Sequence, residues 1–143
     1  MSKQFVSPDK NYRFSIPYTV RVADVNYAGH VSNAAVLNFF QDARIAYFKQ
    51  FGFSELDIGG CGIILPEAHV LYLAEMFLGD ELCIGVRINE LRNAAFVMAY
   101  CIERDGTMMS EGTTNLVAFD YQTRKPRHLP DPFREAVTRF EEL

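Results

Sequence analysis

The segment "SNAAVLNFFQDARIAYFKQF", residues 32–51, constrains the fold of this chain more than any other part of its sequence. Apolar residues recur in it at helical spacing and also spread around the helix well beyond a single stripe. They are Val36, Leu37, Phe39, Phe40, Ala43, Ile45, Tyr47 and Phe48. Ser32 or Asn33 can cap the start of the helix, and Gly52 follows its end. A helix that is apolar over most of its girth must be covered by other elements, so we expect the rest of the chain to wrap around it.

Alternating apolar and polar side chains predict the strands that would cover this helix. Residues 12–22 alternate between apolar and polar side chains, which indicates a strand with one buried face. Pro17 cannot donate to a neighbouring strand and therefore favours an edge position or a bulge. Four further strands are expected after the helix, over residues 64–77, 81–91, 94–104 and 108–121.

The connections complete the predicted fold. Asp105 and Gly106 form a pair that tolerates positive φ, which predicts a hairpin between the last two strands. Asp131 as N-cap and Pro132 at the first helical position predict a final helix that continues over residues 133–143. Helices and strands are segregated along the chain. We therefore expect an α+β fold in which a mostly antiparallel sheet wraps around one long central helix, with a short C-terminal helix.

Composition narrows the class of protein. The chain has 143 residues, of which 49% are apolar. We therefore expect a single domain, residues 1–143, that is large enough to bury a core. The net charge of −4 argues against nucleic-acid binding. We expect no membrane segment and a cytoplasmic location, because the sequence shows neither a signal-peptide pattern nor an apolar run long enough to span a bilayer. The three histidines and three cysteines lack ligand spacing, so we expect no metal site and no cofactor.

The turn "DVNYAGHVSN", residues 24–33, is the candidate for chemistry. It combines the start of the helix, whose first N–H groups lack intrahelical acceptors, with Gly29, where a ligand can approach the backbone closely. Convergent polar side chains favour a functional site here. The alternative is that Gly29 only makes the turn and Asn33 only caps the helix.

Together these features resemble a known family. The turn, the helix "AAVLNFFQDARIAYF", the "GDEL" at residues 79–82 and the closing "SEGTTNLVAFDYQTRKPRHLP" are similar to the hotdog-fold acyl-CoA thioesterases, within them to the 4-hydroxybenzoyl-CoA thioesterase-like group. The resemblance extends roughly over residues 12–130. It implies the hotdog fold, hydrolysis of an acyl-CoA thioester at a site between subunits, and self-association as a homodimer or homotetramer.

The resemblance also assigns residues, with two departures. Asp24, Gly29, His30 and Asn33 match the family pattern D-x-D-x-x-G-H-V-x-N, and Arg44 matches an arginine of the helix. The second aspartate of the pattern, the usual catalytic carboxylate, falls on Asn26. The glutamate often found in the helix falls on Gln41. The usual catalytic Asp is therefore replaced by an amide, which cannot ionise.

Candidate catalytic residues are Asn26, His30, Asp24, Asn33 and Glu67. The backbone at Asn33 would receive the oxyanion, and His30 could act as base. Asp24 could also act as base, although an aspartate there readily bonds turn amides instead. Glu67 could supply a carboxylate to a partner subunit, or it could face solvent together with His69.

Candidate substrate-binding residues lie in two places. Gly29 and Tyr27 belong to the turn itself. Arg92, Arg124 and Lys125 could contact CoA phosphates, although a solvated loop explains the last two equally well.

Two other functions stay open. "DVNYAGH" faintly resembles a hotdog hydratase motif, which would make the protein a hydratase or dehydratase acting on acyl thioesters. The amides at positions 26 and 41 would also suit a non-catalytic acyl-CoA-binding hotdog protein.

Overall fold

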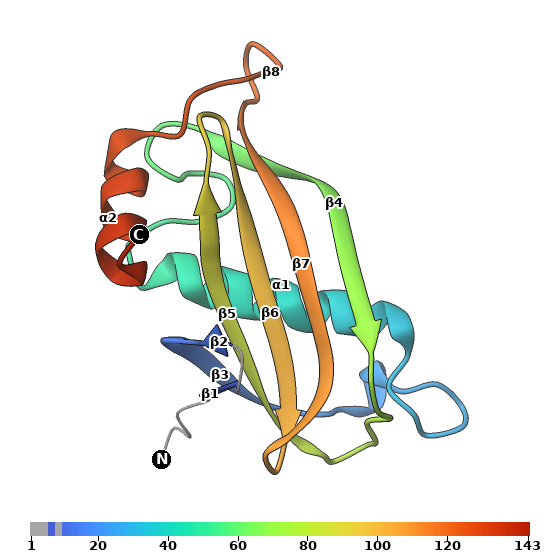
Figure 1. The fold of residues 1–143 in the computed structure, drawn as a ribbon. Helices are drawn as coiled ribbons and strands as arrows, with labels where there is room; N and C mark the ends of the chain where they lie inside the picture. Colours follow the sequence, from blue (N-terminus) through green and yellow to red (C-terminus); the bar gives the residue numbers. More distant parts are fainter. Residues whose placement is uncertain (1–5, 8–9) are drawn as a thin grey trace.

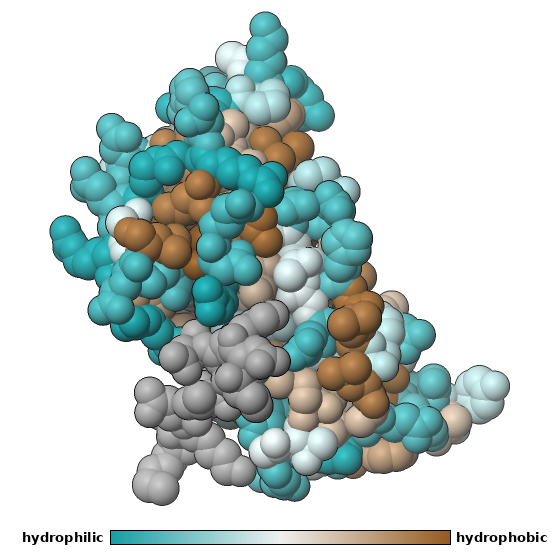
Figure 2. All heavy atoms as spheres, in the orientation of Figure 1, coloured by the Kyte–Doolittle hydropathy of each residue, from teal (hydrophilic) through white to brown (hydrophobic). Residues whose placement is uncertain are grey.

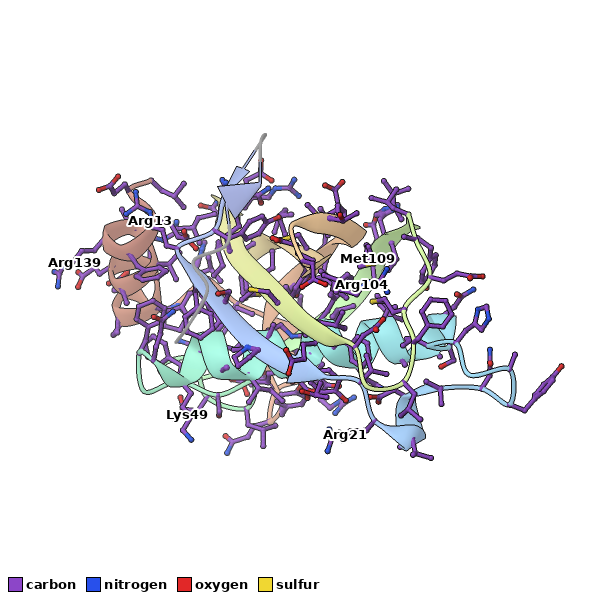
Figure 3. The ribbon with its side chains drawn as sticks, turned by 90° about the horizontal axis from the view of Figure 1, so that it is seen from below. Arg13, Arg21, Lys49, Arg104, Met109 and Arg139 are labelled. Carbon is purple, nitrogen blue, oxygen red and sulfur yellow. The ribbon has the colours of Figure 1, made fainter. Side chains whose placement is uncertain are left out.

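A computed structural model describes residues 6–7 and 10–143 of the chain. One helix and one curved antiparallel sheet form its two main layers, with α1 lying behind the sheet and crossing its strands (Figure 1). Seen from below, α1 runs along the concave side of the sheet (Figure 3). The α+β hotdog architecture that was expected, with a mostly antiparallel sheet around a central helix, is confirmed.

The main sheet has the order β3-β5-β6-β7-β4, and β8 pairs with β7. Its strands are β3 (Phe14–Thr19), β4 (Gly62–Tyr72), β5 (Glu81–Leu91), β6 (Ala95–Arg104), β7 (Thr107–Asp120) and β8 (Lys125–Pro126). The helices are α1 (Asn33–Lys49), α2 (Asp131–Glu141) and the short 3-10 helix η1 (Val22–Asp24). A separate two-stranded sheet joins β1 (Val6–Ser7) and β2 (Lys10–Asn11).

The start of α1 and the β6–β7 hairpin match the sequence. Ser32 is the N-cap, and its side chain accepts a hydrogen bond from the amide of Ala35 at 3.3 Å. At the hairpin, both Asp105 and Gly106 have positive φ, which a type I′ turn requires. Pro17 lies in β3, an edge strand of the sheet, as its missing N–H predicts.

Three of the boundaries that differ from the prediction have a clear physical cause. The strand expected over residues 12–22 covers only Phe14–Thr19, because Asp24 turns back to accept from the amide of Arg21 and starts η1, which leaves Val22 74% exposed. β4 ends at Tyr72, because the next two amides both turn to the carbonyl oxygen of Met109. The N-cap of α2 is Pro130 rather than Asp131, since the carbonyl of Pro130 already accepts from the amide of Arg134.

Helix and sheet meet closely at Gly112 of β7. The ring of Phe40 stacks on Tyr100 of β6, with centroids 4.5 Å apart and an interplanar angle of 14°. A Cβ at position 112 would lie 2.5 Å from the Phe40 ring and 2.7 Å from the carbonyl oxygen of His69. Glycine is required here for close packing, because a side chain would push α1 away from the sheet.

Candidate active site at the start of α1

The turn before α1 is held by Asn26. Its side-chain oxygen accepts from the amides of Ala28 at 2.9 Å and His30 at 3.3 Å. Its backbone amide donates to the carbonyl of His30 at 2.9 Å, and Gly29, with φ of +83°, closes the turn. The amide oxygen of Asn26 therefore organises the loop, as asparagine commonly does in turns.

His30 pairs with a carboxylate that its sequence motif does not contain. Its Nδ1 lies 3.1 Å from an oxygen of Glu75, and its ring packs edge-on against Phe77 with centroids 5.1 Å apart. The side chain of His30 is 36% exposed, so it is reachable from solvent. Because Nδ1 faces Glu75, Nε2 is the ring nitrogen that can act on another molecule.

The segment carrying Glu75 is fixed by tertiary contacts. Arg104 donates to the backbone oxygen of Glu75 at 3.2 Å and forms an ion pair with Asp80 at 2.6 Å. At the other end, the amides of Leu73 and Ala74 donate to the carbonyl oxygen of Met109. Arg104 and Met109 lie beside one another next to this segment (Figure 3). The local sequence around Glu75 carried no signal of a role, because the segment was expected to continue a strand.

A cavity of about 480 Å³ opens where this segment meets the start of α1. Its lining residues are Asn26, His30, Val31, Ser32, Asn33, Val36, Tyr72, Leu73, Ala74, Glu75 and Met76. The amide of Ala35 already donates to Ser32, whereas the amides of Asn33 and Ala34 have no acceptor within the helix, and the helix dipole adds positive potential there. The hydroxyl of Tyr72 donates to the backbone oxygen of Asn33 at 2.9 Å, which ties β4 to the helix. The cavity thus joins a histidine, a carboxylate and a helix N-terminus.

Comparison with known proteins decides the family. A family model described as the thioesterase-like superfamily matches residues 20–137. The chain belongs to this superfamily. A thioesterase from Thermus thermophilus, complexed with coenzyme A and Zn, is 29% identical, with a TM-score of 0.82 over 92% of this chain and 96% of that one. No curated protein matches.

Two more distant structures share the hotdog fold. A 1,4-dihydroxy-2-naphthoyl-CoA thioesterase from Synechocystis is 23% identical, with a TM-score of 0.80 over 87% of this chain and 94% of that one. A hypothetical protein from Staphylococcus aureus in complex with CoA is 19% identical, with a TM-score of 0.83 over 90% and 84%. Together with the family model, these likenesses confirm the resemblance seen in the sequence, at the level of the hotdog fold and the thioesterase-like superfamily.

Asp24 holds the thioesterase turn from outside the cavity. One of its carboxylate oxygens accepts from the hydroxyl of Tyr18 at 2.6 Å and from the amide of Arg21 at 2.9 Å. The neighbouring Tyr27 stands at the tip of the turn and is fully exposed. Asp24 and His30, which are close in sequence, are thus separated by the turn itself.

Glu67 lies on the face of the thioesterase sheet that points away from α1. It accepts from His69 at 2.7 Å and from Asn115 at 2.8 Å, and the hydrogen bond with His69, followed by that from Asn115, lowers the pKa of Glu67. Ala68, the next residue, faces α1. Glu67 and His69 therefore share one face, as the alternation predicted, and that face is opposite the cavity of the same chain.

The basic candidates lie at the other end of the sheet. Arg92 pairs with Glu90 at 2.7 Å beside the β5–β6 connection. Arg124 ends the turn between β7 and β8, and Lys125 begins β8, which lies at the top of Figure 1, whereas α1 starts at the lower right. The guanidinium of Arg124 lies 5.8 Å from the centre of the Phe119 ring. Within one chain, these cations are distant from His30.

Residues 6–7 and 10–143 contain neither a metal-binding cluster nor a membrane-spanning helix. In these ranges, no group of three or more His, Cys, Asp or Glu side chains is placed to hold a metal ion. Within the same described part of the chain, no helix combines the length and apolar character needed to cross a membrane.

Proposed function

We propose that the protein hydrolyses acyl-CoA thioesters in the cavity at the start of α1, with His30 as general base and Glu75 as the residue that orients it. The contact between Nδ1 of His30 and the carboxylate of Glu75, made beside a helix N-terminus, carries this proposal. Membership of the thioesterase-like superfamily supports the reaction class.

In this mechanism, the thioester carbonyl oxygen points at the first-turn amides of α1, beginning with Asn33. Nε2 of His30 takes a proton from water, and the resulting hydroxide attacks the carbonyl carbon. Donors aimed at the developing oxyanion contribute about 3 kcal/mol in well-studied enzymes. The carbon–sulfur bond then breaks, and the imidazolium returns its proton to the departing CoA thiolate. Glu75 stabilises the imidazolium while it exists.

The proposal also accounts for Asn26. An amide cannot take a proton from water, but its oxygen already holds the amides of Ala28 and His30 in place. The carboxylate that the family motif carries at this position is supplied instead by Glu75, from a segment about fifty residues later in the sequence. Asp24 keeps the turn in shape through Tyr18 and Arg21.

We further propose that a second copy of the chain completes the site. β4 ends the strand order of the main sheet, so its outer edge is unpaired within the described residues. Leu65, Leu71, Tyr72 and Leu73 are between 40% and 60% exposed along and just after this strand. Hydrophobic side chains gather over the lower part of the sheet on the face seen in Figure 2. A homodimer, alone or within a tetramer, would cover these side chains.

A twofold axis at this edge has a defined consequence. Two identical edge strands related by a twofold axis across the sheet pair antiparallel. β8 and the basic turn lie near the N-terminal end of β4, and the cavity opens at its C-terminal end. In the antiparallel pair, the N-terminal end of one β4 therefore approaches the C-terminal end of the other copy's β4. The partner's Arg124 and the partner's Lys125 would thereby come near the cavity and meet CoA phosphates. Tyr27, which projects from the same end, would contact the partner or the nucleotide.

The test is thiol release from a panel of aromatic and aliphatic acyl-CoAs, with two matched pairs of variants. His30→Ala should lower kcat/KM at least 100-fold, as loss of a general base does. His69→Ala, at a histidine on the other face, should leave it within about twofold. Glu75→Gln should lower kcat about tenfold, because the amide no longer stabilises the imidazolium. Glu67→Gln is its matched control.

Each alternative has its own outcome. Equal losses for His30→Ala and His69→Ala would refute His30 as the base, and a collapse in Asp24→Asn alone would assign the role to Asp24. Activity that appears only in Asn26→Asp, with a wild type that CoA stabilises against heat, would identify a non-catalytic acyl-CoA-binding protein. A change in enoyl-CoA absorbance without thiol release would identify a hydratase.

A further inference from the structure

A second cavity follows the first along α1. It encloses about 220 Å³ between the helix and strands β4 and β7. Its lining residues are Leu37, Asn38, Phe40, Gln41, Arg44, Leu65, Ala68 and Thr114. The helix residues of the first cavity end at Val36, and those of the second begin at Leu37. The two cavities are thus consecutive in the space between α1 and the edge of the sheet.

Helical spacing places the second cavity on the same side of α1 as the first. Asn33, Leu37, Gln41 and Arg44 recur at intervals of four, four and three residues, which keeps them on one face. From Ala34 in the first turn to Gln41 is about two turns of helix, or about 10 Å. An extended alkyl chain advances about 1.25 Å per carbon, so a chain that starts at the first-turn amides and follows this length of α1 reaches Gln41 after about eight carbons.

The walls of the second cavity are apolar, but its floor is not. Leu37, Phe40, Leu65 and Ala68 supply the walls. The side chain of Arg44, which lines the same cavity, is only 8% exposed. A buried guanidinium beside an acyl site gives a bound chain a polar group to meet, which a purely apolar pocket would not do.

A hydrogen-bond network fixes this floor. Arg44 is held by an ion pair with Glu55 and donates to the hydroxyl of Tyr100 at 3.0 Å. Tyr100 in turn shares a hydrogen bond of 2.7 Å with Thr114, which is 2% exposed and also lines the cavity. Gln41 adds an exposed amide at the rim. Polar groups therefore lie at the floor and rim of an otherwise apolar slot.

We propose that this cavity receives the far end of the acyl group and selects chains of about eight carbons that end in a hydroxyl, since the spacing from the helix start fits that length. The inference rests on the proposed function of the first cavity. A methyl end would remove water from the exposed amide of Gln41 without replacing its hydrogen bonds, whereas a hydroxyl replaces them. A carboxylate end is disfavoured, because Glu55 already neutralises Arg44 and would repel a second anion.

The test compares kcat/KM for 8-hydroxyoctanoyl-CoA and octanoyl-CoA within each variant, so that changes in overall activity cancel. We expect wild type to favour the hydroxylated chain about tenfold, the effect of one well-placed hydrogen bond. Gln41→Leu removes the rim amide and should bring the ratio close to one. Gln50→Leu is the matched control on the same helix, because Gln50 is an exposed residue at its C-terminal end.

Other results would overturn the inference. A wild-type ratio near one would show that the cavity does not read the end of the chain, as would be the case if a partner subunit's side chain filled it. A ratio that survives in Gln41→Leu would place the selection elsewhere, and faster turnover of the carboxylate-ended octanedioyl mono-CoA would contradict the charge argument. If no acyl-CoA releases thiol, the proposed hydrolysis fails. The affinities of the two thioesters, measured by thermal shift, then still test whether the second cavity selects the hydroxylated chain.

Discussion

Replacing Glu55 by glutamine should destabilise the fold, because it leaves the buried charge of Arg44 without a counter-charge. The guanidinium of Arg44 is 8% exposed and Glu55 is 27% exposed, so their ion pair is mostly removed from water. Breaking a buried pair by removing one partner typically costs about 3–5 kcal/mol. Glu55 is partly solvated and the new amide oxygen still accepts a hydrogen bond, so we expect about 2 kcal/mol. For a chain of this size, that lowers Tm by about 8 °C.

Urea unfolding and thermal melts would measure this loss, with Glu90→Gln as the matched control. Glu90 pairs with Arg92 at 2.7 Å, but both side chains are at least half exposed, so its loss should stay below about 0.5 kcal/mol. The double variant Arg44→Met with Glu55→Gln should be more stable than Glu55→Gln alone, because it leaves no unpaired buried charge. A shift of less than about 2 °C in Glu55→Gln, or no recovery in the double variant, would refute the reasoning.

Two further outcomes follow from the packing of α1. Gly112→Ala should lower the free energy of unfolding by about 1–3 kcal/mol, because the new methyl group would lie 2.5 Å from the Phe40 ring; an unchanged urea midpoint would contradict this. Burial, together with the nearby Glu141, raises the pKa of Tyr47, so the folded state keeps a proton that the unfolded state releases above about pH 10. The contribution of Tyr47 to the free energy of unfolding is therefore fully present below about pH 10 and falls as pH rises further. In Tyr47→Phe, the free energy of unfolding, measured as a function of pH, should decline less steeply above about pH 10.

The sequence alone was enough for the fold and for the family. The apolar girth of α1 required a sheet wrapped around it, and the Asp105–Gly106 turn set the β6–β7 hairpin. The motif from Asp24 to Asn33 carried the family resemblance, which the match over residues 20–137 confirms. These features depend on neighbours a few residues apart, whose geometry the chain specifies locally.

Only the tertiary structure decided which distant groups meet. Glu75 reaches His30 because Arg104 and Met109 fix the segment after β4. Both residues lie at least 29 positions later in the sequence than the backbone groups of this segment that they bind. A bulge between Ile64 and Glu67 shifts the alternation of β4, so that Leu65 and Ala68 both face α1 while Glu67 faces away. Spacing along a chain predicts which residues share a face, but the partner of each face depends on register and on long-range packing.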